Sequence, residues 1–130
     1  MLANMSVRYY GGPHSDRGQG RPHWTIYVPW VLAGLTIAGQ IVWILVSGDV
    51  RTFFTIMSVI TFFSAGVSHA YLNRGAGWTI GFFSITLFYG WAIEALGTAT
   101  AFPFGTYTYS AYLGPSIGAV PAIIPLAWSM

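Results

Sequence analysis

Residues 25–47 read TIYVPWVLAGLTIAGQIVWILVS, an apolar run without a charged side chain. An α-helix needs about 20 consecutive apolar residues to cross the hydrocarbon core of a bilayer. Pro29 falls in the first turns, where a missing backbone N–H costs least. Trp24, Tyr27 and Trp30 suit the membrane–water interface, where amphipathic rings gather. The run therefore predicts a transmembrane helix.

Two further apolar runs follow, each bounded by a short polar turn. Residues 52–72 read TFFTIMSVITFFSAGVSHAYL, and residues 78–98 read WTIGFFSITLFYGWAIEALGT. Of the 130 residues, 55% are hydrophobic and only 6% are charged. Soluble domains carry about 25% charged residues, so this chain has too little polar surface for a water-exposed globule. The fold class predicted is all-α, a polytopic transmembrane helix bundle with three full spans.

Charge and polarity set the expected topology. Residues 1–23 are polar and rich in Gly and Pro, which predicts a disordered tail rather than a signal peptide, because the first apolar run is long enough to stay in the membrane. Arg51 lies on one side of the predicted membrane, and four arginines lie on the other: Arg8, Arg17, Arg21 and Arg74. The positive-inside rule then places the N-terminus in the cytoplasm of a multi-pass cell-membrane protein.

Several ligand classes are not expected. The net charge of +2 is too small to indicate a nucleic-acid partner, and the absence of cysteine excludes disulfides and thiolate metal sites. His14, Asp16 and His23 lie in a Gly-rich tail that lacks the fixed geometry of a metal site. No metal is therefore predicted.

The segment after the third span has a different character. Residues 99–121 read ATAFPFGTYTYSAYLGPSIGAVP, without a charge. Irregular backbone at membrane depth must be buried in protein or line a cavity, so we expect a partly re-entrant or cavity-capping loop. Tyr107 and Tyr109 would share one face of an extended segment. Together with Phe102 and Phe104 they could form a wall for a long apolar ligand, and an interfacial aromatic belt is an equal reading. A truncated helix over residues 121–130 is too short to cross, so a fourth span is expected to begin there in a fragment.

Glu94 is the most informative single residue. A charge in the middle of a transmembrane helix costs about 2.5–3.5 kcal/mol, which usually requires a partner or a function. Gly90, Gly97 and Thr98 share its helical face and allow close approach. An apolar site favours the neutral carboxylic acid, which is a usable proton donor. The alternative is a structural carboxyl that hydrogen-bonds a neighbouring helix or the Tyr-rich loop.

Two other polar residues lie in the predicted spans. His69 belongs to a small and polar stripe at helical spacing: Ser58, Thr61, Ala65, Gly66, His69 and Asn73. His69 could act as a proton relay or orient a substrate. Alternatively, the stripe serves helix packing and His69 is simply hydrogen-bonded near the interface. It is expected toward the inner side and Glu94 toward the outer side, so direct pairing would require tilted helices. Gln40 is expected to hydrogen-bond across helices.

Motifs in one order from Trp91 to Met130 resemble a known family. They are Glu94-Ala-Leu-Gly97, Phe102-Pro103-Phe104-Gly105-x-Tyr107-x-Tyr109, Leu113-Gly114-Pro115, Val120-Pro121 and Ile124-Pro125-Leu126-Ala127-Trp128. The pattern is similar to that of the carotenoid biosynthesis membrane proteins, some of which are carotenoid hydratases, including bacterioruberin-precursor hydratases. Its members are longer, so this chain looks like an N-terminal half. Many of them have Gly at the position of Ala101, where small size is expected to matter.

The resemblance implies addition of water across the terminal double bond of an acyclic carotenoid. Glu94 would be the acid, and Tyr107 or His69 would place the water. Aromatic faces would stabilise the carbocation, in a substrate-binding set of Trp91, Phe102, Phe104, Gly105, Tyr109 and Trp128. The chemistry requires no cofactor. The implied partners are membrane lipid, the carotenoid substrate and other carotenoid-pathway membrane enzymes.

Two other readings remain open. A non-enzymatic transporter or proton-handling component would also use Glu94, although the chain shows no repeated spans of the kind that transporters often have. An inactive fragment or packing subunit is the third reading, since half a bundle need not enclose a site.

Overall fold

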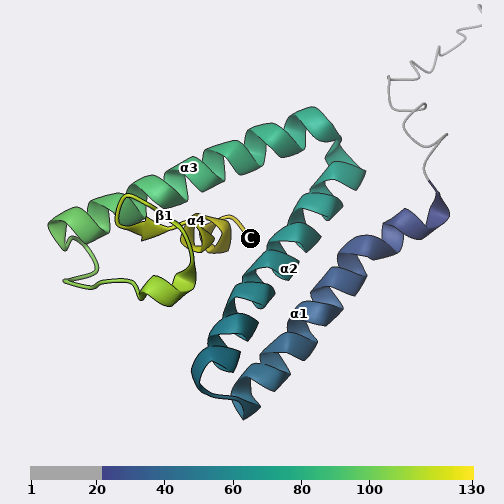
Figure 1. Cartoon of the computed structure of the whole chain (residues 1–130). Coiled ribbons are helices and arrows are strands. Elements are labelled where there is room, and N and C mark those ends of the chain that lie inside the picture. The colour runs from purple at the N-terminus through teal and green to yellow at the C-terminus, as the bar shows by residue number, and fades with distance from the viewer. Residues whose placement is uncertain (1–21) are drawn as a thin grey trace, which may run out of the picture.

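The computed structural model describes residues 22–130 (Figure 1). Most of the predicted tail lies outside these residues, including His14, Asp16 and three of the arginines. A short 3₁₀ turn η1 (His23–Tyr27) leads into α1 (Val28–Leu45), which is followed by α2 (Gly48–Arg74) and α3 (Ala76–Thr100). Within the described part of the chain, three helices are long and apolar enough to cross a membrane. The predicted all-α fold with three spans is confirmed.

Helices α1 and α2 run side by side and are joined by hydrogen bonds between side chains (Figure 1). The Thr36 and Thr61 hydroxyl oxygens lie 2.8 Å apart, and the Trp43 indole N–H donates to Thr55 Oγ1 over 2.9 Å. Such bonds between hydroxyl groups suit an interface without water. The prediction that Gln40 would do this was wrong. Gln40 is exposed, and within residues 22–130 its amide makes no hydrogen bond, because it lies on the outward side of α1.

The small and polar stripe of α2 divides between two neighbouring helices. Ser58 lies against Gly39 of α1, while Gly66 lies against the ring of Phe83 on α3. The rings of Phe63 and Phe83 pack edge to face with centroids 5.2 Å apart. The stripe therefore serves helix packing on both of its sides, which is the plainer of its two interpretations.

The segment after α3 folds back into the fork between α2 and α3 (Figure 1). It contains a 3₁₀ turn η2 (Ala111–Leu113), the strands β1 (Ser116–Ile117) and β2 (Val120–Pro121), and α4 (Ile123–Trp128). The two strands pair antiparallel. Val120 and Pro121 are fully buried, so this hairpin is anchored in the protein. Its irregular backbone is thereby packed against helices rather than left facing lipid.

Helix α3 ends in a left-handed residue. Ala101 has φ +58°, and its N–H donates to the carbonyl oxygen of Gly97 over 2.9 Å. The Gly105 N–H then donates to the Ala101 carbonyl over 2.7 Å, which turns the chain back toward the helix. A side chain in this conformation costs roughly 1–2 kcal/mol. The preference for glycine here follows from backbone conformation, in addition to the small size expected from the sequence.

We predict that Ala101→Gly stabilises the fold. Glycine adopts positive φ without the Cβ clash but loses more backbone entropy, so the net gain is about 1 kcal/mol. Denaturant titration of the parent and the variant in detergent micelles measures this change in the free energy of unfolding. A lower unfolding midpoint in the variant would show that the Ala101 methyl group makes a stabilising contact.

Candidate functional site

The Glu94 carboxyl is buried and accepts three hydrogen bonds from the C-terminal segment. The side chain is 6% exposed. The hydroxyl groups of Tyr107 and Tyr109 donate to Oε2 over 2.7 Å and 2.6 Å, and the Trp128 indole N–H donates to Oε1 over 2.8 Å. We call these four residues the carboxylate cluster. It joins α3, the loop that follows it and the last turn of α4.

The alternation of the loop sequence places both phenols on one face. Tyr107 and Tyr109 are separated by one residue, and their rings meet edge to face with centroids 5.5 Å apart. The prediction that they share a face is therefore confirmed. The structural alternative for Glu94, a carboxyl bonded to the Tyr-rich loop, describes these contacts as well.

Two glycines of α3 give the aromatic rings room to reach the carboxyl. A Cβ added at Gly97 would lie 2.6 Å from the Tyr107 hydroxyl oxygen, and one at Gly90 would lie 2.7 Å from Trp128 Cβ. Both distances are shorter than van der Waals contact allows. The close approach expected on this face of α3 is thus made by the C-terminal segment of the same chain.

Hydrogen bonding in the cluster suits the carboxylate form of Glu94. Three donors point at its two oxygens, whereas a neutral carboxylic acid would have to donate one hydrogen bond itself. The sequence favoured the neutral acid because it could not show these donors. The hydrogen bond to Glu94 raises the pKa of Tyr107, and burial followed by the same carboxyl raises the pKa of Tyr109. Both phenols therefore hold their protons at neutral pH.

The carboxyl opens onto a pocket, and a second pocket continues along α3. The first has a volume of about 400 Å³ and is lined by Glu94, Tyr109, Ile124, Ala127 and Trp128. The second has a volume of about 320 Å³ and is lined by Ile85, Thr86, Tyr89, Gly90 and Trp128. Both reach Trp128, so a largely apolar surface leads along the helix to the carboxyl.

The remaining four residues of the predicted substrate-binding set, three aromatic residues and one glycine, are placed differently from one another. Phe104 lies at the rim of the cluster, with ring centroids 6.4 Å from Tyr107 and 6.5 Å from Trp128. Phe102 is 72% exposed and makes no ring contact within residues 22–130. The Trp91 indole N–H donates to the Ile117 carbonyl over 3.2 Å and so ties the hairpin to α3. Gly105 has φ +83° and contributes a turn.

His69 is not brought into the cluster. It is exposed on α2, about 9 Å along the helix from the turn at Gly75, whereas Glu94 lies about 28 Å along α3 from that turn. The two helices diverge from the turn (Figure 1). The carbonyl oxygen of His69 accepts a hydrogen bond from the Asn73 amide over 2.8 Å. No direct contact between His69 and Glu94 is present.

Sequence reasoning missed two pocket residues, Ile124 and Ala127. Both lie in the Ile-Pro-Leu-Ala-Trp motif at residues 124–128, of which only the tryptophan was assigned to the site. Residues 124 and 127 are three apart in α4, so one helix face carries both side chains toward the pocket at Glu94. The positions of Ile124 and Ala127 relative to Trp128 in the helix could therefore have indicated that they line the site.

Residues 50–130 match the family described as carotenoid biosynthesis protein. The chain belongs to this family. The matched region contains α2 from residue 50 onward, all of α3 and every residue of the carboxylate cluster, and the resemblance inferred from the motifs is confirmed. Comparison with curated proteins and with solved structures gave no match. Together with the three apolar helices, the family makes this a multi-pass membrane protein of the carotenoid pathway.

We predict that Gly97→Ala disrupts the cluster, since the new methyl group would overlap the Tyr107 hydroxyl. Overpacking of this kind typically costs about 1–3 kcal/mol. Gly81→Ala is the matched control in the same helix, because nothing lies within 4 Å of its added Cβ. It is expected to gain about 0.5–1 kcal/mol. Denaturant titration of both variants in detergent measures the difference, and equal stabilities would contradict the close packing at Gly97.

A second prediction concerns alkaline titration. The hydrogen bond to Glu94 raises the pKa of Tyr107, and burial followed by the same carboxyl raises the pKa of Tyr109, so folding stability should hold below pH about 10 and fall as the pH rises above it. Glu94→Gln removes the negative charge, so tyrosinate absorbance should appear at lower pH in the variant than in the parent protein. Tyr107→Phe and Tyr109→Phe assign the change to each phenol. Superimposable titrations of parent and Glu94→Gln would remove the carboxylate as the cause.

Proposed function

We propose that this protein adds water across the terminal double bond of an acyclic carotenoid, with the carboxylate cluster as its acid and base. The supporting observation is a buried carboxyl, held by three donors, that opens onto a mainly apolar pocket. Membership of the carotenoid biosynthesis family supplies the substrate class. A long polyene could lie along the surface from Ile85 to Glu94 with its end at the carboxyl.

The proposed reaction has two steps. A proton from the cluster adds to the less substituted carbon of the terminal double bond, and the more substituted carbon becomes a tertiary carbocation. Water then attacks that carbon, and its proton returns to the cluster. The product is a tertiary alcohol heavier by one water, and the cluster ends in its starting protonation state.

The phenols make it possible for the cluster to hold the acid proton. A phenol hydroxyl can accept a hydrogen bond as well as donate one. When Glu94 is protonated, Tyr107 or Tyr109 can turn its O–H away and accept from the carboxyl group. The same hydroxyl can then orient the attacking water. We assign the water to Tyr107 and Tyr109 rather than to His69, which lies outside the cluster.

Aromatic faces near the carboxyl suit the cationic intermediate. The rings of Phe104 and Trp128 lie with centroids 6.5 Å apart beside Glu94. A cation over an aromatic face gains about 0.5–2 kcal/mol, more when water is excluded. The carboxylate adds Coulombic stabilisation once it has given up its proton.

The test is pigment analysis in cells that accumulate lycopene. The protein, with any residues that its gene encodes beyond Met130, should convert part of the lycopene to a product heavier by one water, detected by mass spectrometry. Glu94→Gln should lower that product at least about 100-fold, because general acid–base catalysis typically contributes that much or more.

Asp49→Asn is the matched control, since it makes the same carboxyl-to-amide change in the first turn of α2, outside the cluster. It should retain the parent yield at equal membrane abundance. Full product yield from Glu94→Gln would remove Glu94 as the acid. No hydrated product from the parent protein with several acyclic carotenoids would overturn the hydration proposal and favour a non-enzymatic proton-handling role.

A further inference from the structure

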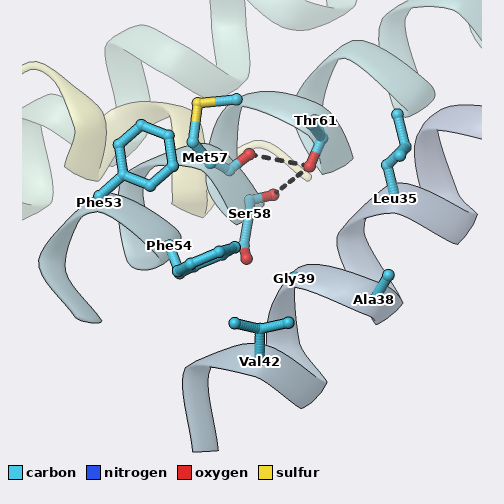
Figure 2. A pocket seen from close by; sticks show the side chains of 9 residues that line it. All are labelled: Leu35, Ala38, Gly39, Val42, Phe53, Phe54, Met57, Ser58 and Thr61. Carbon is cyan, nitrogen blue, oxygen red and sulfur yellow. Dashed lines mark hydrogen bonds between the residues drawn. The ribbon is translucent and has the colours of Figure 1, made fainter. Parts of the chain in front are cut away.

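Another pocket lies between α1 and α2, apart from the two pockets at α3 (Figure 2). Its volume is about 290 Å³. The lining residues are Leu35, Ala38, Gly39, Val42, Phe53, Phe54, Met57, Ser58 and Thr61. None of them belongs to the site around Glu94. Leu35 and Phe53 are 55% and 57% exposed, so the pocket opens on the outer surface of the two helices, where lipid would lie.

The pocket contains one unpartnered hydroxyl group. Ser58 is 5% exposed, and its Oγ makes no hydrogen bond within the described residues. In Figure 2 this oxygen points from α2 toward Gly39, away from Thr61. An added Cβ at Gly39 would lie 3.4 Å from it, so the hydroxyl is buried against Gly39, which lines the same pocket. A buried hydroxyl without a partner is costly, which makes it a candidate for a ligand contact.

The polar neighbour of Ser58 is already satisfied. The Thr61 hydroxyl is bonded to the Thr36 hydroxyl and donates to the carbonyl oxygen of Met57. A water molecule needs two to four polar partners to be held in a buried site. With Ser58 as the remaining free group, this pocket is poorly suited to water and better suited to an apolar molecule that carries one oxygen.

We propose that the α1–α2 pocket binds the oxygen-bearing end of an isoprenoid chain, an alcohol or a ketone, with that oxygen on Ser58 Oγ. The volume is roughly that of two benzene-sized cavities, so it holds one end of the chain while the rest extends into lipid. Membership of the carotenoid biosynthesis family argues for an isoprenoid rather than another lipid. The proposal depends on this membership and requires no hydration at Glu94.

The test uses two photoreactive probes and no turnover. One is a diazirine analogue of farnesol, and the other is the same molecule with hydrogen in place of the hydroxyl group. Each is irradiated with the protein in detergent micelles, and peptide mass spectrometry locates the adducts. The alcohol probe should label the residues around Ser58 more strongly than its hydrocarbon counterpart. Loss of one hydrogen bond in Ser58→Ala should lower alcohol labelling about fivefold to tenfold and leave hydrocarbon labelling unchanged.

Ser84→Ala is the matched control, the same change at an exposed serine of α3, and should leave both labelling patterns unaltered. Ser58→Ala removes an unpartnered hydroxyl, so its unfolding midpoint should equal or exceed that of the parent. Gly39→Ala is an independent second variant. Its methyl group would cover the Ser58 hydroxyl and should lower labelling by the alcohol probe alone.

Three results would overturn the proposal. They are equal labelling of the parent by the two probes, alcohol labelling that survives both variants, and adducts found only around Glu94. Because no product is measured, a failed hydration assay and a failed labelling experiment can be told apart.

Discussion

The carboxyl of Glu94 is satisfied inside the protein by three donors that all follow α3 in the chain. A carboxyl at this depth of an apolar helix is costly unless hydrogen-bond donors meet it. The donors lie 13, 15 and 34 residues further along, so the chain must turn at Ala101 and pack back against the helix that it has just left. At Gly90 and Gly97 the absence of a side chain on α3 leaves room for the aromatic residues that pack against it. The irregular segment is thus held in place by the polar group that it covers.

The same rule of polar satisfaction governs the contact between α1 and α2. Threonine hydroxyls and the Trp43 indole N–H form hydrogen bonds across the interface, and the threonine hydroxyls also bond to backbone carbonyl oxygens of their own helices. Ser58 departs from this rule, since its oxygen is buried without a partner beside an apolar pocket. Among the described residues, the Glu94 carboxyl is thus fully hydrogen-bonded, whereas the buried Ser58 hydroxyl has no partner.

The proposed proton chemistry at the cluster depends on the ability of the phenols both to donate and to accept hydrogen bonds. As donors they hold Glu94 as a carboxylate, and as acceptors they would allow it to carry a proton. Their raised pKa values keep the protons on oxygen at neutral pH, so in the proposed reaction the phenols would orient and relay rather than ionise. Exchange between these two arrangements is what an acid that must be regenerated in each cycle requires.

What could be read from the sequence follows from local rules. Hydropathy along residues 25–98 determined three spans, because crossing a bilayer depends on the composition of a single segment. A lone carboxyl in an apolar run singled out Glu94, and a period of two placed Tyr107 and Tyr109 together. Predictions of contacts with segments far away in the sequence were left open or were wrong. Only the tertiary structure decided that Trp128 donates to Glu94, that Gln40 faces outward and that His69 stands apart. Those contacts depend on the path of the loop and on the rotation and crossing of helices, which no single segment encodes.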